Sequence, residues 1–370
     1  MTDSDTSHTQ LQAPLPWQQA QWQQLRDSHA RRELANAYLL SGAQGLGKLL
    51  FATGFARAVL CDKQAEQEQQ AGQGTISTND GACGQCSNCR LGSESLHPDI
   101  QLVAVGEGSR LISVDQIRDL AEFIHHTSHA GKWKFVVVPD AHCMNLAAAN
   151  ALLKTLEEPS PATTLFLISD LPGRLLPTVR SRCQKIQFPT PGTEQGLHWL
   201  ESQLTGQPCR ELLAMAKGRP LAALQLADTD GLATRQQFTT RLEQLWQGTI
   251  GIEAVCKEVE QLDVEAMLEH LSGISSMLVR AVLNIRPAQT AETSSELQSL
   301  QQVVREQVAQ EQTVQEAASS AQTQHSIARR LLMFSQDVNQ AIRQIRSGTN
   351  PNIQLMLESL LFRWQSVKSG

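Results

Sequence analysis

Three short runs of apolar residues in the first half of the chain mark the expected interior strands. They cover residues 37–41 (AYLLS), 135–138 (FVVV) and 164–168 (TLFLI). Helical patterns separate them, over 49–60 and over 146–158, where Pro159 ends the second helix. Continuous apolar strands that alternate with helices indicate a parallel sheet covered on both faces. The pattern therefore predicts an α/β domain over residues 1–190.

From about residue 191 onward the strand pattern stops and the chain is helical in character. We predict a small helical domain over 191–245. Within it, Gly218-Arg219-Pro220 is expected to begin a helix, because proline is favoured in the first turn of a helix. A larger helical domain is predicted over 246–370. Its last helix carries one apolar stripe at helical spacing, made of Ile353, Met356, Leu357, Leu360, Leu361 and Trp364. Such a stripe usually packs into a core, and a subunit contact is the alternative.

Two segments lack this periodicity. Residues 64–82 are rich in Gln, Glu, Gly and Thr, and we expect a flexible surface insertion there. Residues 287–325 are rich in Gln, Ala, Ser and Glu, which fits either a long solvated helix or partial disorder.

The composition narrows the functional classes. Hydrophobic residues make up 41% of the 370 residues, enough for a substantial core. The 31 basic and 37 acidic residues give a net charge of −6, which argues against a protein that grips nucleic acid over its whole surface and leaves a local basic patch open. No apolar run reaches the ~18 residues of a membrane span, and residues 1–12 lack the features of a signal peptide. We therefore expect a cytoplasmic protein without membrane contact, whose cysteines are thiols or metal ligands.

A glycine-rich loop over residues 42–49 (GAQGLGKL) joins the first strand to the following helix, as a P-loop does. Its N–H groups can cradle phosphates at the helix N-terminus, and its lysine can reach the terminal phosphates. The candidate nucleotide-binding residues here are Gly42, Gly45, Gly47 and Lys48. Leu49 departs from the P-loop pattern because it has no hydroxyl to hold Mg²⁺. The loop predicts descent from a P-loop. Two alternatives remain for its present role: it binds ATP or ADP, or it is a glycine-rich turn that binds no ligand.

The second element of a phosphoryl-transfer site would follow the strand at 135–138. That strand ends in Pro139-Asp140-Ala141. Asp140 is a candidate metal-binding residue, but Ala141 stands where a carboxylate would polarise the attacking water. Oxygen ligands are thus missing at two places where the chemistry needs them, which argues against a working ATPase.

Cys83, Cys86 and Cys89 lie within seven residues at short, regular spacing. Four thiolates suit tetrahedral zinc, and we predict a structural zinc module over 61–89 with Cys61 as the fourth ligand. His97 is the alternative fourth ligand. An iron–sulfur cluster is the alternative metal group, although the run lacks the Cys-Pro of bacterial ferredoxins. The other cysteines are expected to be small buried residues: Cys143, Cys183, Cys209 and Cys256.

Arg182 follows the strand at 164–168, within Arg180-Ser181-Arg182-Cys183. It is either a solvated turn residue or an arginine finger, whose planar guanidinium stabilises charge on a transferring phosphoryl group. The residues alone do not decide. Glu157 and Glu158 are adjacent on a helix and point about 100° apart, so we interpret them as structural residues and not as an acid/base pair.

Together these residues resemble the clamp-loader branch of the AAA+ family. The resemblance rests on residues 150–159 (NALLKTLEEP), on Ser181-Arg182-Cys183, on the cysteine knuckle after the P-loop helix and on His97-Pro98-Asp99. It implies a RecA-like AAA+ P-loop domain with a zinc knuckle, followed by an all-α lid and an all-α C-terminal collar that joins the subunits.

The resemblance also implies a role in opening a ring-shaped sliding clamp and loading it on primed DNA. Hydrolysing subunits of this branch carry Thr or Ser after the loop lysine and Asp-Glu at the strand end, so Leu49 and Ala141 resemble a subunit that does not hydrolyse ATP. Arg182 would then act on the ATP site of a neighbouring subunit. The implied partners are the delta and gamma/tau subunits, with the clamp and DNA contacted indirectly.

Two other functions are alternatives to this one. An ATP-hydrolysing subunit of the same branch is the alternative that Leu49 and Ala141 disfavour. A zinc-dependent nucleic-acid-binding protein is disfavoured because Lys, Arg and aromatic residues are scarce around the knuckle.

Overall fold

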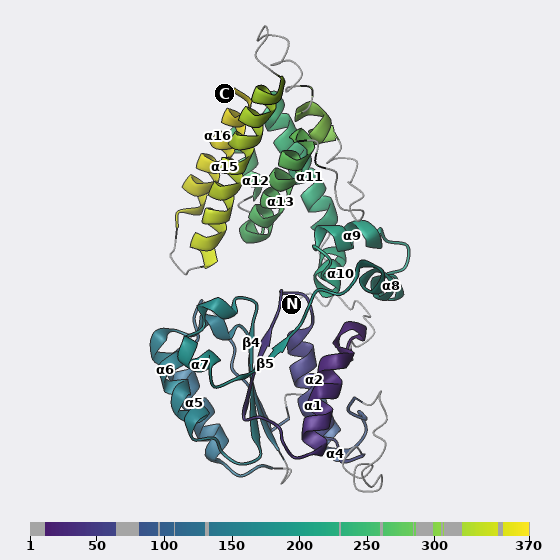
Figure 1. Cartoon of the computed structure of the whole chain (residues 1–370), viewed down its shortest axis with the longest axis vertical. Coiled ribbons are helices and arrows are strands. Elements are labelled where there is room, and N and C mark those ends of the chain that lie inside the picture. Colours follow the sequence, from purple (N-terminus) through teal and green to yellow (C-terminus); the bar gives the residue numbers. More distant parts are fainter. Residues whose placement is uncertain are drawn as a thin grey trace. The chain divides into compact units, whose positions relative to one another are not determined.

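The computed structural model describes most of the chain and divides it into two compact units (Figure 1). The described residues are 12–63, 81–94, 97–106, 108–129, 133–228, 231–259, 262–283, 285, 299–304, 306, 320–346 and 351–369. The first unit comprises Met1–Gly206 and Gly218–Ala223, and the second comprises Gln207–Lys217 and Leu224–Gly370.

The described part of the first unit contains a parallel sheet of five strands in the order β2-β3-β4-β1-β5. The strands are β1 (Ala37–Ser41), β2 (Ile100–Leu102), β3 (Lys134–Val138), β4 (Thr163–Ser169) and β5 (Gln184–Gln187). The three predicted strands are confirmed as β1, β3 and β4. The sequence pattern missed β2 and β5 because these edge strands are short and carry exposed or half-buried polar residues.

Helices cover both faces of this sheet (Figure 1). One face packs against α1 (Gln19–Ala30) and α2 (Lys48–Leu60), and the other against α5 (Val114–His125), α6 (Leu146–Glu157) and α7 (Pro177–Arg180). Tyr38 and Leu40 enter the first core and Leu39 enters the second, since side chains alternate along a strand. Burial on both faces is the reason for the uninterrupted apolar runs.

The parallel direction of the strands decides where the loops lie. The loops that leave the carboxyl ends of β1, β3 and β4 all emerge at one edge of the sheet. The chain leaves β1 toward β2 and leaves the adjacent β4 in the opposite direction, toward β5. This edge therefore contains a topological switch point, where α/β proteins bind their ligands. The glycine loop and Asp140 therefore lie at the same edge.

The second unit is helical wherever the structure describes it. Its helices include α9 (Cys209–Met215), α11 (Gly231–Gln247), α12 (Ile252–Val259), α13 (Val264–Val282), α15 (Ser320–Arg346) and α16 (Ile353–Ser369). Trp364 of the predicted stripe is fully buried in the core, and its Nε1 donates to the Leu242 carbonyl at 3.1 Å. The described residues after Gln187 contain no strand, which confirms the helical character predicted for this part.

The two unpatterned segments are described only in part. Of residues 64–82, the structure describes only 81 and 82. Of residues 287–325, it describes 299–304, 306 and 320–325, and all of these are helical. The remaining residues of both segments lie outside the described part of the chain, so both predictions stay predictions there.

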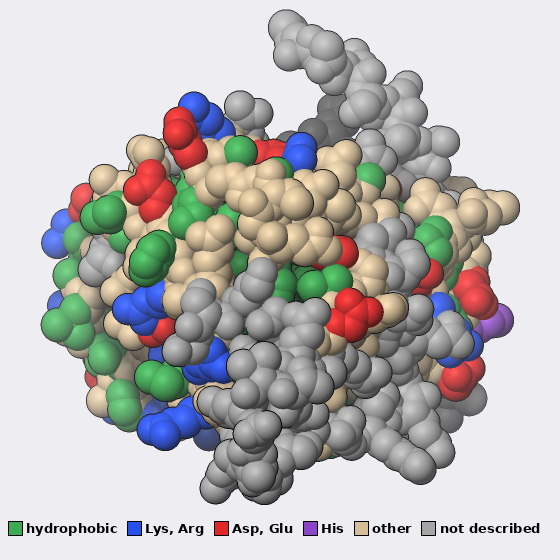
Figure 2. Space-filling view, turned by 90° about the horizontal axis from the view of Figure 1, so that it is seen from above, with side chains coloured by type: hydrophobic (Ala, Val, Ile, Leu, Met, Phe, Trp, Pro, Cys, Tyr) green, Lys and Arg blue, Asp and Glu red, His purple; other side chains and the backbone are tan. Residues whose placement is uncertain are grey.

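Some large hydrophobic side chains reach the surface. On α15 and α16, at least 48% of the side chain is exposed at Leu332, Met333, Leu355 and Phe362. Figure 2 shows hydrophobic side chains interspersed with charged ones on the face that it draws. None of the helices in the described ranges combines the length and the apolar character needed to cross a membrane.

Candidate functional site

The glycine loop occupies the turn between β1 and α2. Gly45 and Gly47 have φ angles of 80° and 78°, in the left-handed region that glycine adopts without steric cost. A Cβ atom added to Gly45 would lie 2.6 Å from Cβ of Ala222, in α10 (Pro220–Asp228). Glycine therefore allows α10 to approach the loop backbone closely, and Pro220 opens that helix as predicted.

Lys48 supports the first part of the loop. Its side chain is buried, and its Nζ donates to the carbonyls of Gly42 and Ala43 at 2.7 and 2.6 Å. Burial lowers the pKa of Lys48, and the nearby carboxylates of Asp170 and Asp140 oppose that shift. The lysine that would reach phosphates in a P-loop here binds backbone oxygen atoms of its own loop.

The start of α10 supports the middle of the loop. The Leu221 amide donates to the Gly45 carbonyl at 3.3 Å, and Arg219 Nη1 lies 3.5 Å from the Gln44 carbonyl oxygen, at the limit of a hydrogen bond.

The segment before α1 supports the end of the loop. Trp17 Nε1 donates to the Leu46 carbonyl at 3.1 Å, and Gln18 Nε2 donates to the carbonyls of Leu46 and Gly47 at 2.8 and 3.0 Å. With these contacts, every carbonyl from residue 42 to residue 47 accepts a hydrogen bond from the chain itself. The loop therefore has protein partners that hold its shape.

The two positions that depart from the ATPase pattern lie close to this loop. Leu49 is in the first turn of α2 and its side chain is 41% exposed. Ala141 is fully buried and packs in the core beside α5 and α6. Neither side chain offers an oxygen atom, so the two ligand positions identified from the sequence remain without one.

The structure adds two residues to Asp140 that the sequence analysis did not identify. Carboxylate and imidazole atoms of Asp140, His142 and Asp170 lie within 4.8 Å of one another and form a group that could hold a metal ion. His142 Nδ1 is 3.4 Å from Asp170 Oδ1 and 3.3 Å from Ser169 Oγ. The signal that could have found them is their place just after β3 and β4, because parallel strands bring such residues to one edge.

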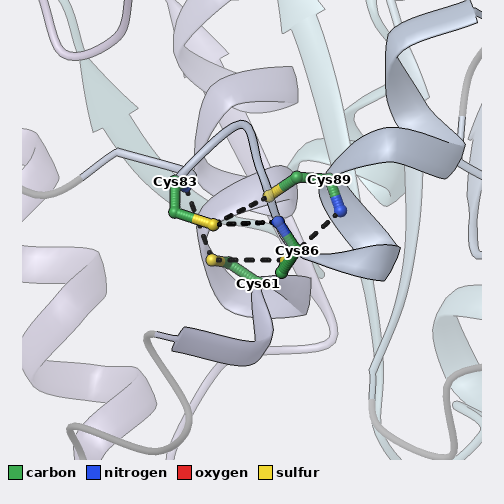
Figure 3. Close-up of side chains that lie close together, drawn as sticks. All are labelled: Cys61, Cys83, Cys86 and Cys89. Carbon is green, nitrogen blue, oxygen red and sulfur yellow. Dashed lines mark hydrogen bonds between the residues drawn. The ribbon is translucent and has the colours of Figure 1, made fainter.

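The four predicted cysteine ligands converge in space (Figure 3). The Cys61 and Cys86 sulfur atoms are 3.9 Å apart, as are those of Cys83 and Cys89. Thiolates about 2.3 Å from one tetrahedral ion lie roughly 3.8 Å from one another, so the spacing fits a single metal ion. Cys61 ends α2, and the other three cysteines lie before and within α4 (Ser87–Glu94).

The surroundings of the four sulfur atoms differ, so the thiolate form is favoured at some of these cysteines and disfavoured at others. Backbone N–H groups of Cys83, Cys86 and Cys89 donate to cluster sulfur atoms at 3.4–3.5 Å. A hydrogen bond from the Gln85 backbone is the main cause that lowers the pKa of Cys83 to about 6, whereas burial raises the pKa of Cys89. Several adjacent thiolates repel one another, so full ionisation of the cluster calls for a cation.

His97, the alternative fourth ligand, is held outside the sulfur cluster. The Asp99 backbone N–H donates to His97 Nδ1 at 3.0 Å, so the neutral ring carries its proton on Nε2, which lies 3.3 Å from Asn88 Oδ1. Asn88 Nδ2 in turn donates to the Leu60 carbonyl at 3.2 Å and to Asp62 at 2.8 Å. His97 therefore fixes Asn88, and Asn88 fixes α4 against the end of α2. Outer partners of this kind orient metal ligands.

The remaining four cysteines are separate from this cluster. Cys183, Cys209 and Cys256 are buried as predicted. Cys143 is only half-buried, which corrects the prediction for that residue, because it lies in the loop after β3 at the open edge of the sheet.

Arg182 lies in the turn between α7 and β5. The neighbouring Cys183 points inward, is 8% exposed and donates from Sγ to the Val179 carbonyl at 3.2 Å. This anchor leaves the Arg182 side chain at the surface, where 38% of it is exposed and Nη2 lies 2.7 Å from Glu157 Oε1. The sequence analysis did not pair these two residues, because they are distant in the chain.

Comparison with known proteins agrees with these features. The sequence model of the family described as "DNA polymerase III, delta subunit" matches residues 17–192. The chain is 32% identical to DNA polymerase III subunit delta' of Pseudomonas aeruginosa over 95% of this chain and 97% of that protein. It is 33% identical to the Escherichia coli subunit of the same name over 61% of this chain and 65% of that protein.

Among solved structures, a DNA polymerase III gamma subunit-related protein of Thermotoga maritima aligns over 94% of this chain and 99% of that chain. The sequence identity is 18% and the TM-score is 0.44.

The contacts of Asn88 lead to a first prediction. Asn88→Ala removes the contacts of Asn88 with His97 Nε2 and with the Leu60 carbonyl. Loss of partly buried hydrogen bonds of this kind costs about 1–3 kcal/mol. We expect α4 to separate more readily from α2, seen as faster amide exchange in residues 83–94 of the full chain. Gln85→Ala, at an exposed position in the same segment, is the matched control and should leave the exchange unchanged. Equal exchange in wild type and Asn88→Ala would contradict this role.

Proposed function

The chain belongs to the DNA polymerase III subunit delta' family, and from this membership we propose that it is a clamp-loader subunit that does not hydrolyse ATP. In this proposal it takes part in loading the sliding clamp on primed DNA during replication, in the cytoplasm. Its partners are the delta and gamma/tau subunits of the loader. The observation that carries the proposal is the pair Leu49 and Ala141 at the switch-point edge of the P-loop domain.

The absence of hydrolysis follows from the chemistry of that edge. Phosphoryl transfer needs a hydroxyl ligand for Mg²⁺ and a group that orients the attacking water. Leu49 and the buried Ala141 supply neither, although Asp140 and Lys48 are retained. The loop carbonyls are bound by the chain's own donors, which supports a loop that serves the fold. The alternative is an ATP-hydrolysing subunit. It is disfavoured because the side chains at positions 49 and 141 can neither bind Mg²⁺ nor orient the attacking water.

The cysteine cluster is proposed to hold one structural zinc ion. The support is the 3.9 Å spacing between sulfur atoms and the N–H donors directed at them. An iron–sulfur cluster places several iron atoms between its cysteines and needs a wider arrangement. Bound zinc would offset part of the negative charge of the four thiolates and join α4 to the end of α2. Cys61 is the proposed fourth ligand, because both ring nitrogens of His97 contact other groups: Nδ1 the Asp99 backbone N–H and Nε2 the Asn88 side chain.

The helical parts are proposed to serve assembly. Residues 191–245 would form the lid, and residues 246–370 the collar, in the manner of AAA+ clamp loaders. The exposed hydrophobic side chains on α15 and α16 support a collar contact with other subunits. Arg182 is proposed to reach the ATP site of a neighbouring subunit, and its exposure in the turn before β5 supports that role.

The metal proposal predicts about one zinc ion per chain in the purified protein, the stoichiometry of one four-thiolate site. Elemental analysis measures it. Cys86→Ser should lower the zinc content, whereas Cys143→Ser, outside the cluster, should not. Protein without metal, or protein with iron and a visible charge-transfer band, would refute the zinc site.

The nucleotide loop predicts that the isolated chain does not turn over ATP. The reason is that the Leu49 side chain has no oxygen atom to bind Mg²⁺, and the Ala141 side chain has no carboxylate to polarise the attacking water. The measurement is steady-state phosphate release, with Lys48→Ala as the background control. Hydrolysis clearly above that control would contradict the prediction and show that other groups complete the site. Weak nucleotide binding without hydrolysis would not contradict it.

The finger role predicts that Arg182→Ala leaves folding and assembly intact, because exposed substitutions usually change stability by less than about 0.5 kcal/mol. The DNA- and clamp-stimulated ATPase of the reassembled loader should fall. The fall should be smaller than the ~10³–10⁵-fold of single-site systems, because the other sites keep their own arginines. Arg182→Lys should rescue poorly, since lysine lacks the planar fork.

Lys185→Ala is the matched control, since it removes an exposed positive charge three positions away. It should leave the stimulated rate unchanged. A complete loader that contains Arg182→Ala and keeps full activity would make Arg182 a surface turn residue.

A further inference from the structure

The Arg182 side chain is held by two partners within the described structure. Its Nη1 donates to the Thr178 carbonyl at 3.0 Å, one turn earlier in the chain. Its Nη2 forms an ion pair with Glu157 Oε1 at 2.7 Å, and 51% of the Glu157 side chain is exposed. The carbonyl restrains the position of the guanidinium, and the carboxylate fixes the direction of its second terminal nitrogen.

The place of Glu157 in its own helix does not account for a carboxylate there. Glu157 is the last residue of α6, where the helix dipole disfavours negative charge and favours positive charge. A glutamate at this end is therefore unfavourable for the isolated helix. The guanidinium of Arg182 offsets that charge, which ties the two residues together.

We propose that Glu157 is a positioning residue for Arg182, and this rests on the proposed finger role. An arginine has more N–H donors than the two engaged here, and the guanidinium is planar. While Thr178 and Glu157 hold its plane, the remaining donors favour one direction at the surface. A phosphate of a nucleotide bound to the adjacent subunit then meets an arginine that has already lost much of its rotamer freedom.

The exposure of the pair limits how strongly it can act. Exposed ion pairs contribute little because water screens both charges. The restraint is therefore weak enough for Arg182 to adjust to a phosphate as charge develops on it. A positioning role of this kind acts on the rate of transfer more than on the affinity for ATP, since it concerns an interaction that is completed in the transition state.

The test uses the complete reassembled loader with Glu157→Gln, which keeps the size of the side chain and removes its charge. We expect normal subunit stoichiometry and a stimulated kcat reduced by up to about fivefold, the effect that corresponds to an exposed ion pair. The KM for ATP should change less. Glu158→Gln, the adjacent residue with the same charge change, is the control and should behave as wild type.

A second comparison separates positioning from a general structural role. In the Arg182→Ala background, Glu157→Gln should cause no further loss, because its effect passes through the arginine. An equal loss in both backgrounds would overturn the proposal, and so would a wild-type rate for Glu157→Gln alone. A higher rate would also overturn it, since Glu157 would then be withholding Arg182. If Arg182→Ala itself has no effect, the finger role fails first and the positioning role fails with it.

Discussion

The hydrogen bonds to the carbonyl groups of the glycine loop are the constraint on which the first unit depends. Residues 42–47 have no regular secondary structure of their own, so their carbonyls have no partners from a helix or sheet ladder. The partners come from three places in the chain: the side chain of Lys48, the start of α10 and the segment that contains Trp17 and Gln18. The loop thereby becomes the point at which the N-terminal segment, the sheet and α10 are joined.

This arrangement gives the loop a structural role that does not depend on a bound nucleotide. A loop whose shape depended on a bound nucleotide would lose that shape when the nucleotide-binding groups were lost. Here Lys48 is buried and donates to two loop carbonyls, so it has a structural reason to persist. Glycine at position 45 is likewise needed because α10 approaches its backbone. Leu49 and Ala141 donate no hydrogen bond to these loop carbonyls, and neither side chain carries an oxygen atom.

Much of the first unit was predictable because its strands are buried on both faces. The apolar runs at β1, β3 and β4 follow directly from that burial, and the glycine loop and cysteine spacing are local patterns. The edge strands β2 and β5 could not be found in this way, since exposure removes the apolar signal. The contacts of His142 with Asp170 and of Arg182 with Glu157 depend on the strand order and on helix packing, which residue spacing does not contain. Glu157 was interpreted from its neighbour Glu158, whereas its partner lies after the next strand.

The turn before β5 shows how burial and exposure are divided between adjacent residues. Cys183 is anchored in the core by the Val179 carbonyl, and this places Arg182 on the outside of the same turn. Without contacts to other residues, an exposed arginine in a turn would sample many rotamers. The Thr178 carbonyl and Glu157 limit that freedom from two different elements, α7 and α6. The packing of α6 and α7 in one core thus brings both partners of Arg182 together and holds its side chain at the surface.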